Sequence, residues 1–304
     1  MSRHRTVVTL LFLAGVLAVM LPIVSGAQEK PKKGLERSVE YKLRLAPEML
    51  QPGKLAALWT LIGVQDWKLT PKKCRLIRFL DVDGDYLAGT GYIVRHRLKL
   101  GTEACPESVP ATMKDGDVTL KFRTRNAARV EEESRADWMQ DGAGEPKLEK
   151  DVGLARGGEG SLQLTRTHSA SAKLDTKDVP DTVARLREGF PNSLLPLVGS
   201  TPLGAGCHRV LEESWELAAV QTPAPDTSGL PDGFDLVAWY AVAKDDKKSG
   251  SPSVVELSFK AKDDDGEAAN DAHALFIRII ETVDPAWLAP GGSKTEAAAA
   301  CANE

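Results

Sequence analysis

Ionic side chains occupy alternate positions in residues 36–45, Glu-Arg-Ser-Val-Glu-Tyr-Lys-Leu-Arg-Leu. Glu40, Lys42 and Arg44 share one parity, and the other parity is mostly apolar. Because successive side chains of a β-strand point to opposite faces, this stretch predicts a strand with one ionic and one apolar face. A solvated outer face of a β-sandwich is one explanation of the pattern, and a functional face with carboxylates and cations in a fixed order is the other.

The same alternation recurs in residues 92–100, 117–125 and 254–262. Each stretch has cations on one parity and hydrophobic residues on the other. With Lys42 and Arg44, the cations of this parity are Arg95, Arg97, Lys99, Lys121, Arg123, Arg125, Lys260 and Lys262. Repetition on four separate strands is not typical of an ordinary sandwich, and it favours a functional face.

The remaining elements indicate a barrel. Further strands are predicted at 74–81, 161–174, 208–217 and 234–242, and helices at 47–63, after Asp178 and at 266–283. About eight strands with few helices indicate an α+β fold, a closed or nearly closed antiparallel β-barrel or tunnel with helices packed outside. If the ionic parity faces the lumen, the lumen must be wet and receive a polyanion, because uncompensated buried ions are costly.

The sequence predicts a single tunnel domain at 28–290, with an excursion around 140–160 and a flexible tail at 291–304. Residues 1–27 have the features of a signal peptide: Arg-His-Arg at 3–5, an apolar run and Ser-Gly-Ala before the cleavage point. The mature chain would then be secreted or periplasmic and have no membrane contact, and an uncleaved membrane anchor is the alternative. With 39 Lys and Arg against 43 Asp and Glu, the chain has no general attraction for nucleic acid. The sequence leaves the oligomeric state open.

The four cysteines predict disulfides in an oxidising compartment. Cys74 begins one predicted strand and Cys105 follows the next, so these two are expected to pair at the open end of a hairpin. Cys207 with Cys301 would be the remaining pair.

The turn of that hairpin, Asp81-Val-Asp-Gly-Asp85, begins with the spacing of a calcium-binding loop. Tyr86 stands at the glycine position of such a loop, and Tyr92 stands where the bidentate Glu belongs. A solvated turn is therefore favoured. His96 falls on the apolar parity and is expected to pack in a core.

In this order and spacing, the motifs resemble the CYTH superfamily, the triphosphate tunnel metalloenzymes. Glu40-x-Lys42 resembles part of the Glu-x-Glu-x-Lys signature of that family. The other matching motifs are Arg78-Phe-Leu-Asp81, Leu87, Gly91, Arg95-His-Arg97, Val118-Thr-Leu-Lys121 and Glu256-Leu-Ser-Phe-Lys260. The resemblance extends over about residues 36–285, nearly the whole mature chain.

The resemblance implies a tunnel in which Lys and Arg bind a triphosphate and Glu residues hold divalent ions. The substrate-binding residues are then Lys42, Arg95, Arg97, Lys121 and Lys260, with Arg44 and Arg123 on the same parity. Glu40 and Glu256 are the implied ligands of Mg²⁺ or Mn²⁺, and Glu40 and Lys42 the predicted catalytic residues. The implied substrate is a small polyanion such as tripolyphosphate or a nucleoside triphosphate.

Two positions depart from the family pattern. Ser38 stands at the first Glu of the signature, and Ser258 stands where the last strand usually has its second carboxylate. Mg²⁺ and Mn²⁺ prefer carboxylate oxygens, so the two serines stand where metal ligands are expected. The sequence therefore matches the cations of the family site better than its carboxylates. The residues that could compensate are Glu36, Glu212, Glu213 and Glu216.

The sequence therefore predicts a divalent-metal-dependent hydrolase of triphosphate- or polyphosphate-type anions. The first alternative is a non-catalytic polyphosphate-binding protein with a degenerate metal site. The second is a carrier of apolar ligands, which would require the hydrophobic parity inside the barrel and the Lys and Arg parity in solvent.

Overall fold

The computed structural model describes residues 36–82, 86–101, 105–110, 113, 115–141, 146–156, 161–219, 231, 233–243, 245–262 and 266–289. The predicted signal peptide and the tail at 291–304 lie outside these ranges. Cys301 and the side chain of Cys207 also lie outside the description, so their pairing stays a prediction. In the described part of the chain, no helix is long and apolar enough to cross a lipid bilayer.

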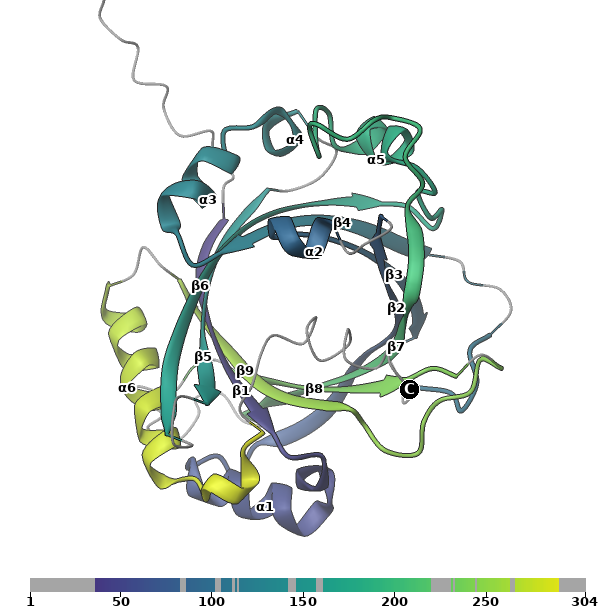
Figure 1. Ribbon diagram of the computed structural model, residues 1–304. Coiled ribbons are helices and arrows are strands. Elements are labelled where there is room, and N and C mark those ends of the chain that lie inside the picture. The colour runs from purple at the N-terminus through teal and green to yellow at the C-terminus, as the bar shows by residue number, and fades with distance from the viewer. Residues whose placement is uncertain are drawn as a thin grey trace, which may run out of the picture. The chain divides into compact units, whose positions relative to one another are not determined.

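Among the described residues, nine strands form a closed barrel (Figure 1). They are β1 (Glu36–Leu45), β2 (Lys68–Asp81), β3 (Tyr92–Gly101), β4 (Asp115–Thr124), β5 (Lys147–Arg156), β6 (Leu162–Asp175), β7 (Gly204–Ala218), β8 (Phe234–Ala241) and β9 (Val254–Lys262). The order around the barrel is β1-β5-β6-β4-β3-β2-β7-β8-β9, and β9 pairs back to β1. The barrel with helices outside is therefore confirmed.

The barrel differs from the predicted one because of β5. This strand lies in the stretch 140–160, which the composition predicts to be an excursion, and it pairs in parallel with β1. The barrel therefore has one parallel pair and more than the expected eight strands. Lys, Glu, Asp and Gly have low strand propensity, so the local sequence favours a loop. Hydrogen bonds to β1 on one side and β6 on the other hold β5 as a strand.

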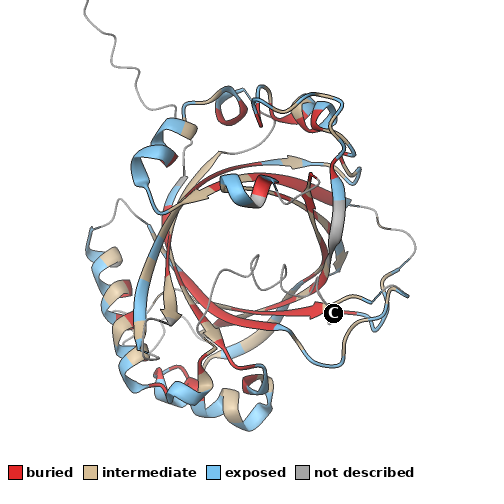
Figure 2. Ribbon diagram, in the orientation of Figure 1, coloured by how far each residue is buried: buried red, intermediate tan, exposed pale blue. Residues whose placement is uncertain are grey.

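The apolar parity of β1 and β9 faces outward, where helices cover it (Figure 2). The amphipathic helix α6 (Gly266–Thr282) packs Phe276 against Tyr41 and Phe259, with ring centroids 5.3 and 6.3 Å apart. Helix α1 (Pro52–Leu61) and the 3-10 turn η1 (Pro47–Leu50) add Leu58 and Met49 to this layer. The 3-10 turn η3 (Pro285–Trp287) follows α6.

A second outer layer covers β4 and β6. It is formed by α3 (Ala127–Glu133), α4 (Asp137–Gln140) and α5 (Val183–Gly189). Asn126 and Thr182 cap α3 and α5 by accepting hydrogen bonds from backbone N–H groups of the first turn. Trp138 of α4 joins the cluster that contains Leu120 of β4. His96 is 0 % exposed on the outward parity of β3, as its apolar position predicts.

The predicted disulfide between Cys74 and Cys105 is present. Glu213, on the outward parity of β7, accepts a hydrogen bond from the Cys105 backbone N–H at 2.6 Å and pairs with Lys248 at 3.3 Å. At the other end of β2, Asp81 Oδ1 accepts the backbone N–H of Leu87 at 2.9 Å. This bond fixes the start of the short helix α2 (Tyr86–Thr90), so Asp81 belongs to the turn.

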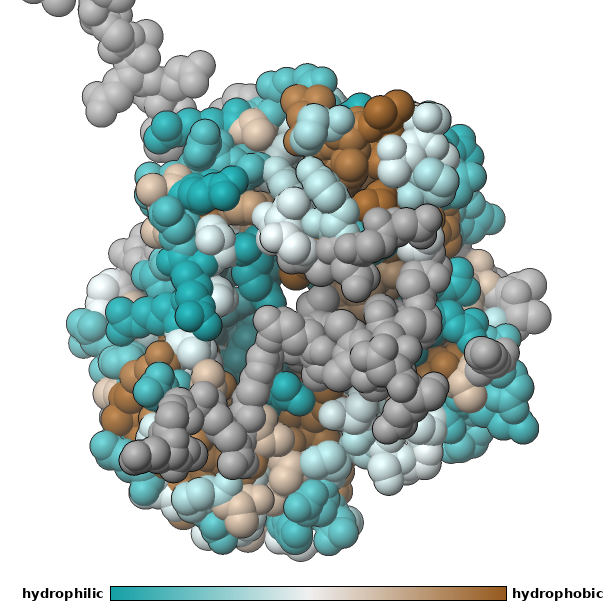
Figure 3. Space-filling model, viewed as in Figure 1, coloured by the Kyte–Doolittle hydropathy of each residue, from teal (hydrophilic) through white to brown (hydrophobic). Residues whose placement is uncertain are grey.

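An apolar patch remains on the outer surface near α4 and α5 (Figure 3). In this region Leu195 and Val198 are each 68 % exposed. The loop that carries them is anchored by Arg187 of α5, which donates to the backbone carbonyls of Ser193 at 2.8 Å and Leu197 at 2.9 Å.

Candidate functional site

The ionic parity of the strands lines a cavity of about 450 Å³ inside the barrel. All seven residues predicted to bind substrate lie at its wall, together with Glu40 and Glu256. Lys42, Arg97 and Lys121 therefore converge with Lys260 in one cavity, as the strand parity predicts. This arrangement contradicts the apolar-ligand carrier, which would place Lys and Arg in solvent. Lys99 and Lys262 are exposed and do not line the cavity.

Positive charge predominates among the described lining residues. The cations are Lys42, Arg44, Arg75, Arg95, Arg97, Lys121, Arg123, Arg125 and Lys260. The carboxylates are Glu40, Glu149, Asp151, Asp235 and Glu256. Nine cations against five carboxylates leave a surplus of four positive charges among these lining residues. Asp117 and Glu212, which pair with Arg97 and Arg75 behind the lining, reduce this surplus to two, in a protein whose net charge is −4. A lumen with this balance favours a small polyanion.

Three carboxylates cluster where β1 lies beside β5. The parallel pairing places Glu40 beside Asp151 and Ser38 beside Glu149. One carboxylate oxygen from each of Glu40, Glu149 and Asp151 lies within 4.8 Å of the others. Glu149 thus supplies a carboxylate next to Ser38, the position where the family signature has one.

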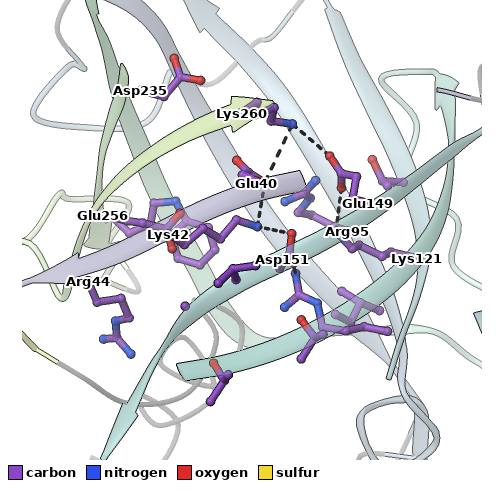
Figure 4. A pocket seen from close by; sticks show the side chains of 18 of the residues that line it. Glu40, Lys42, Arg44, Arg95, Lys121, Glu149, Asp151, Asp235, Glu256 and Lys260 are labelled. Carbon is purple, nitrogen blue, oxygen red and sulfur yellow. Dashed lines mark hydrogen bonds and ion pairs between the residues drawn. The ribbon is translucent and has the colours of Figure 1, made fainter. Parts of the chain in front are cut away.

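Lysines and an arginine surround this cluster (Figure 4). Lys42 Nζ lies 2.8 Å from Glu40 Oε2 and 2.9 Å from Asp151 Oδ1. Lys121 and Lys260 each lie 3.0 Å from a Glu149 oxygen, and Arg123 lies 2.9 Å from Asp151. Each of the three carboxylates therefore has at least one cation in contact.

These contacts shift the pKa values of the cluster. The Lys121 ammonium, assisted by Lys260 and Lys42, holds the pKa of Glu149 well below its ordinary range. Burial by itself would raise the pKa of Asp151, but the neighbouring cations outweigh it and lower that pKa. Burial would likewise lower the pKa of Lys42, but Glu40 and Asp151 raise it. The carboxylates are therefore ionised at neutral pH, and Lys42 is protonated.

Arg95 and Arg97 on β3 have opposite surroundings. Arg97 binds Asp117 through Nε at 2.7 Å and donates to Thr119 Oγ1 at 3.1 Å. In the described part of the chain, no carboxylate pairs with Arg95, and its Nε is buried without a hydrogen-bond partner. Burial, followed by the charge of Arg97, lowers the pKa of Arg95 to about 9. A buried guanidinium of this kind at a cavity wall is suited to an anionic ligand.

The carboxylates suggested by the sequence have other positions. Glu256 lines the cavity but lies opposite Arg44 in the β1–β9 pairing, and it is not part of the cluster. Glu212 contacts Arg75 at 3.8 Å, and Glu216 contacts Lys72 at 3.3 Å. Glu213 lies on the outer face of the barrel. None of Glu212, Glu213 and Glu216 therefore supplies the carboxylate that is missing at Ser38. The side chain of Glu36 lies outside the described residues.

Sequence reasoning missed Glu149 and Asp151. The signal was present, because these two alternate with Leu148, Lys150 and Val152 in the same period of two as β1. The Gly-rich and charged residues on either side favoured a loop and hid this alternation.

No family model matches the sequence, and no curated protein matches it. Some solved structures show a distant likeness. HpAC1 from Hippeastrum, described as revealing a dominant triphosphatase activity, is 12 % identical over 86 % of this chain and 95 % of its own, with a TM-score of 0.43. The Bacillus halodurans protein bh2851, described as a candidate adenylate cyclase, is 13 % identical over 87 % of this chain and 98 % of its own, with a TM-score of 0.40. A Vibrio parahaemolyticus protein with the same description is 9 % identical over 88 % and 99 %, with a TM-score of 0.36. At these values the likeness does not assign the chain to a family.

Proposed function

We propose that this protein hydrolyses triphosphate-type anions with the help of a divalent cation, inside the cationic cavity of its barrel. The observation that supports this best is the cluster of Glu40, Glu149 and Asp151 within a lumen that has a surplus of positive charge. A phosphoryl-transfer site needs both parts, since anionic oxygens must be neutralised and a metal must be held beside them.

The donor set fits Mg²⁺ or Mn²⁺, because both prefer carboxylate oxygens. Glu40, Glu149 and Asp151 would hold the ion, which when bound polarises a phosphoryl oxygen and neutralises charge on it. Lys42 now contacts two of these carboxylates and must turn away from them to make room. A phosphate chain offers the Lys42 ammonium an alternative partner, so the ligand itself favours this rearrangement.

The other cations are proposed to bind and orient the phosphate chain. Lys121, Lys260 and Arg123 lie around the carboxylate cluster, whereas Arg95 and Arg97 extend the cationic wall along β3. Hydrogen bonds from these charged donors to phosphate oxygens are short and strong. Glu40 and Lys42 are the proposed catalytic residues. Glu40 would hold the divalent metal ion, and Lys42 would contact the phosphoryl oxygens.

A binding protein without catalysis is the second candidate. The observation in its favour is that Lys42, Lys121, Lys260 and Arg123 already neutralise the three carboxylates. A divalent ion is then not required to neutralise the carboxylate cluster before the anion enters. The two candidates differ in turnover, not in the location of the ligand.

The deciding experiment measures phosphate release from tripolyphosphate and ATP, with Mg²⁺, with Mn²⁺ or with chelator. We expect release that requires metal and is lost in Glu40→Gln and Asp151→Asn. Both variants should retain or strengthen tripolyphosphate binding in chelator, because each removes a negative charge beside the anion. The control is Asp235→Asn, a lining carboxylate outside the cluster that pairs with Lys72 at 2.8 Å, and it should keep full release.

Full release by Glu40→Gln would show that the metal assignment is wrong. Binding without release under every metal condition would replace the hydrolase with the binding protein. Absence of both would remove the proposed function.

We also propose that the chain is exported, cleaved after residue 27, and secreted or periplasmic. The Cys74–Cys105 disulfide supports this, because such bonds persist in oxidising compartments. N-terminal sequencing of the mature protein should begin at Gln28, and an intact residue 1 would contradict cleavage.

A further inference from the structure

One loop on the outside of the barrel exposes two large apolar side chains. Leu195 and Val198 are each 68 % exposed, whereas every other exposed large hydrophobic residue in the described part of the chain is at most 43 % exposed. Both lie in the loop 190–203, which follows α5 in the region of the apolar patch (Figure 3). Pro196, between them, is exposed as well. Single exposed apolar residues are common, but several on one loop mark a contact surface.

The loop has no charged side chain. Residues 190–203, Phe-Pro-Asn-Ser-Leu-Leu-Pro-Leu-Val-Gly-Ser-Thr-Pro-Leu, contain no Asp, Glu, Lys, Arg or His, although Asp, Glu, Lys and Arg make up 27 % of the chain. Exposed loops are ordinarily polar, because water then solvates their side chains. A segment that enters lipid must instead be free of charge, since charged groups are costly to bring into the bilayer.

The backbone of the loop is hydrogen-bonded within the protein. Arg187 of α5 donates to the carbonyls of Ser193 at 2.8 Å, Leu194 at 3.3 Å and Leu197 at 2.9 Å. The other loop carbonyls that accept backbone N–H groups are those of Phe190, Val198, Gly199 and Thr201. The prolines at 191, 196 and 202 have no N–H to satisfy. Lipid cannot supply hydrogen bonds, whereas a protein partner can, so this backbone is suited to lipid.

The loop is held in one conformation against a local cost. Leu194 has a φ of 56°, in the left-handed region that a bulky side chain rarely adopts. Leu194 is 3 % exposed and packs in the outer layer, whereas its neighbour Leu195 is exposed. Such backbone strain persists where the surrounding structure holds it and is concentrated at contact sites. A loop fixed in this way loses little conformational entropy when it docks.

We propose that the loop 190–203 is a peripheral docking element that places Leu195 and Val198 in the headgroup–acyl boundary of a lipid bilayer. A protein partner is less favoured, because stable protein interfaces bury about 1,200–2,000 Å² and two side chains supply a small part of that area. Membrane affinity scales with the buried apolar area, so this contact is weak and reversible. It differs from the expectation of no membrane contact, because a peripheral loop needs no spanning segment.

The experiment measures flotation of the purified protein with phosphatidylcholine vesicles in a density gradient, over a series of lipid concentrations. We expect the wild type to float with the vesicles. The double variant Leu195→Ser, Val198→Ser should lower the partition coefficient by about tenfold or more, because it removes the apolar area that lipid would cover. The matched control is Leu164→Ser, which changes another exposed leucine, 43 % exposed on β6, and should float as the wild type does. Urea unfolding of each variant shows that the fold is retained.

Absence of wild-type flotation would overturn the proposal without recourse to any variant. Equal flotation of the double variant, or equal loss in Leu164→Ser, would remove the loop assignment. Sedimentation velocity without lipid provides the remaining arm: self-association of the wild type that the double variant abolishes would make the loop an interface between copies of the chain and overturn membrane docking. Leu195 and Val198 do not line the barrel cavity, so the phosphate-release experiment tests the proposed function independently.

Discussion

Replacing Arg95 with Met should raise the free energy of unfolding of the protein and lower its affinity for tripolyphosphate. Burial lowers the pKa of Arg95 from 12.5 to about 9. At about 1.36 kcal/mol for each pKa unit, this difference corresponds to about 5 kcal/mol against the charged form. Because the side chain borders a wet cavity, we expect about 1–2 kcal/mol of that cost to appear as added unfolding free energy. The folded pKa lies below the unfolded one, so the cost is fully present at pH 7 and declines only above about pH 9.

Arg97→Met is the matched comparison, because it makes the same change two residues along the same strand. Arg97 neutralises Asp117, which is 2 % exposed. Its removal leaves a buried carboxylate without that partner, which costs about 3–5 kcal/mol of unfolding free energy. The two variants should therefore move stability in opposite directions. Both should weaken tripolyphosphate binding by about tenfold or more, because each removes a charge-assisted contact.

Urea unfolding at pH 7, followed by circular dichroism, gives the two free energies, and calorimetry in chelator gives the two affinities. The reasoning is refuted if Arg95→Met destabilises the protein as much as Arg97→Met does. It is also refuted if Arg95→Met leaves the affinity for tripolyphosphate unchanged, since Arg95 would then have no role in binding.

Two further variants test the cluster and the disulfide. The Lys121 ammonium is the main cause of the lowered pKa of Glu149 in the folded protein. This interaction stabilises the fold at pH values above the unfolded pKa of about 4.3, and the stabilisation is lost as the pH falls through the folded pKa. Lys121→Met should therefore shift the midpoint of acid unfolding, measured by circular dichroism, to higher pH. An unchanged midpoint in Lys121→Met, or the same shift in Lys121→Arg, would contradict the Lys121–Glu149 ion pair. Cys105→Ser opens a loop with a sequence separation of 31 from Cys74. It should lower the unfolding free energy by about 3–4 kcal/mol in urea, and reduced wild type should match it; a loss below about 1 kcal/mol would show that the bond contributes little.

The sequence determined which face of β1, β3, β4 and β9 is ionic. Alternation with a period of two is a local property of strand geometry, so the positions of Lys42, Arg97, Lys121 and Lys260 could be inferred without knowing which strands are neighbours. The Cys74–Cys105 pair could also be inferred, because Cys74 lies on β2 and Cys105 follows β3, the next strand of the same hairpin. The boundaries of β1 and β9 were also predicted correctly.

Only the tertiary structure decided where the acidic half of the site lies. β5 is a strand because β1 and β6 pair with it, and β1 lies more than 100 residues earlier in the chain. Its parallel register with β1 brings Glu149 and Asp151 to Glu40, and no local pattern specifies that register. Closure of the barrel likewise brings Ile77 of β2 and Val237 of β8 into one buried cluster. Local geometry therefore fixed the face of each side chain, whereas non-local pairing fixed its neighbours, and the neighbours determine the chemistry.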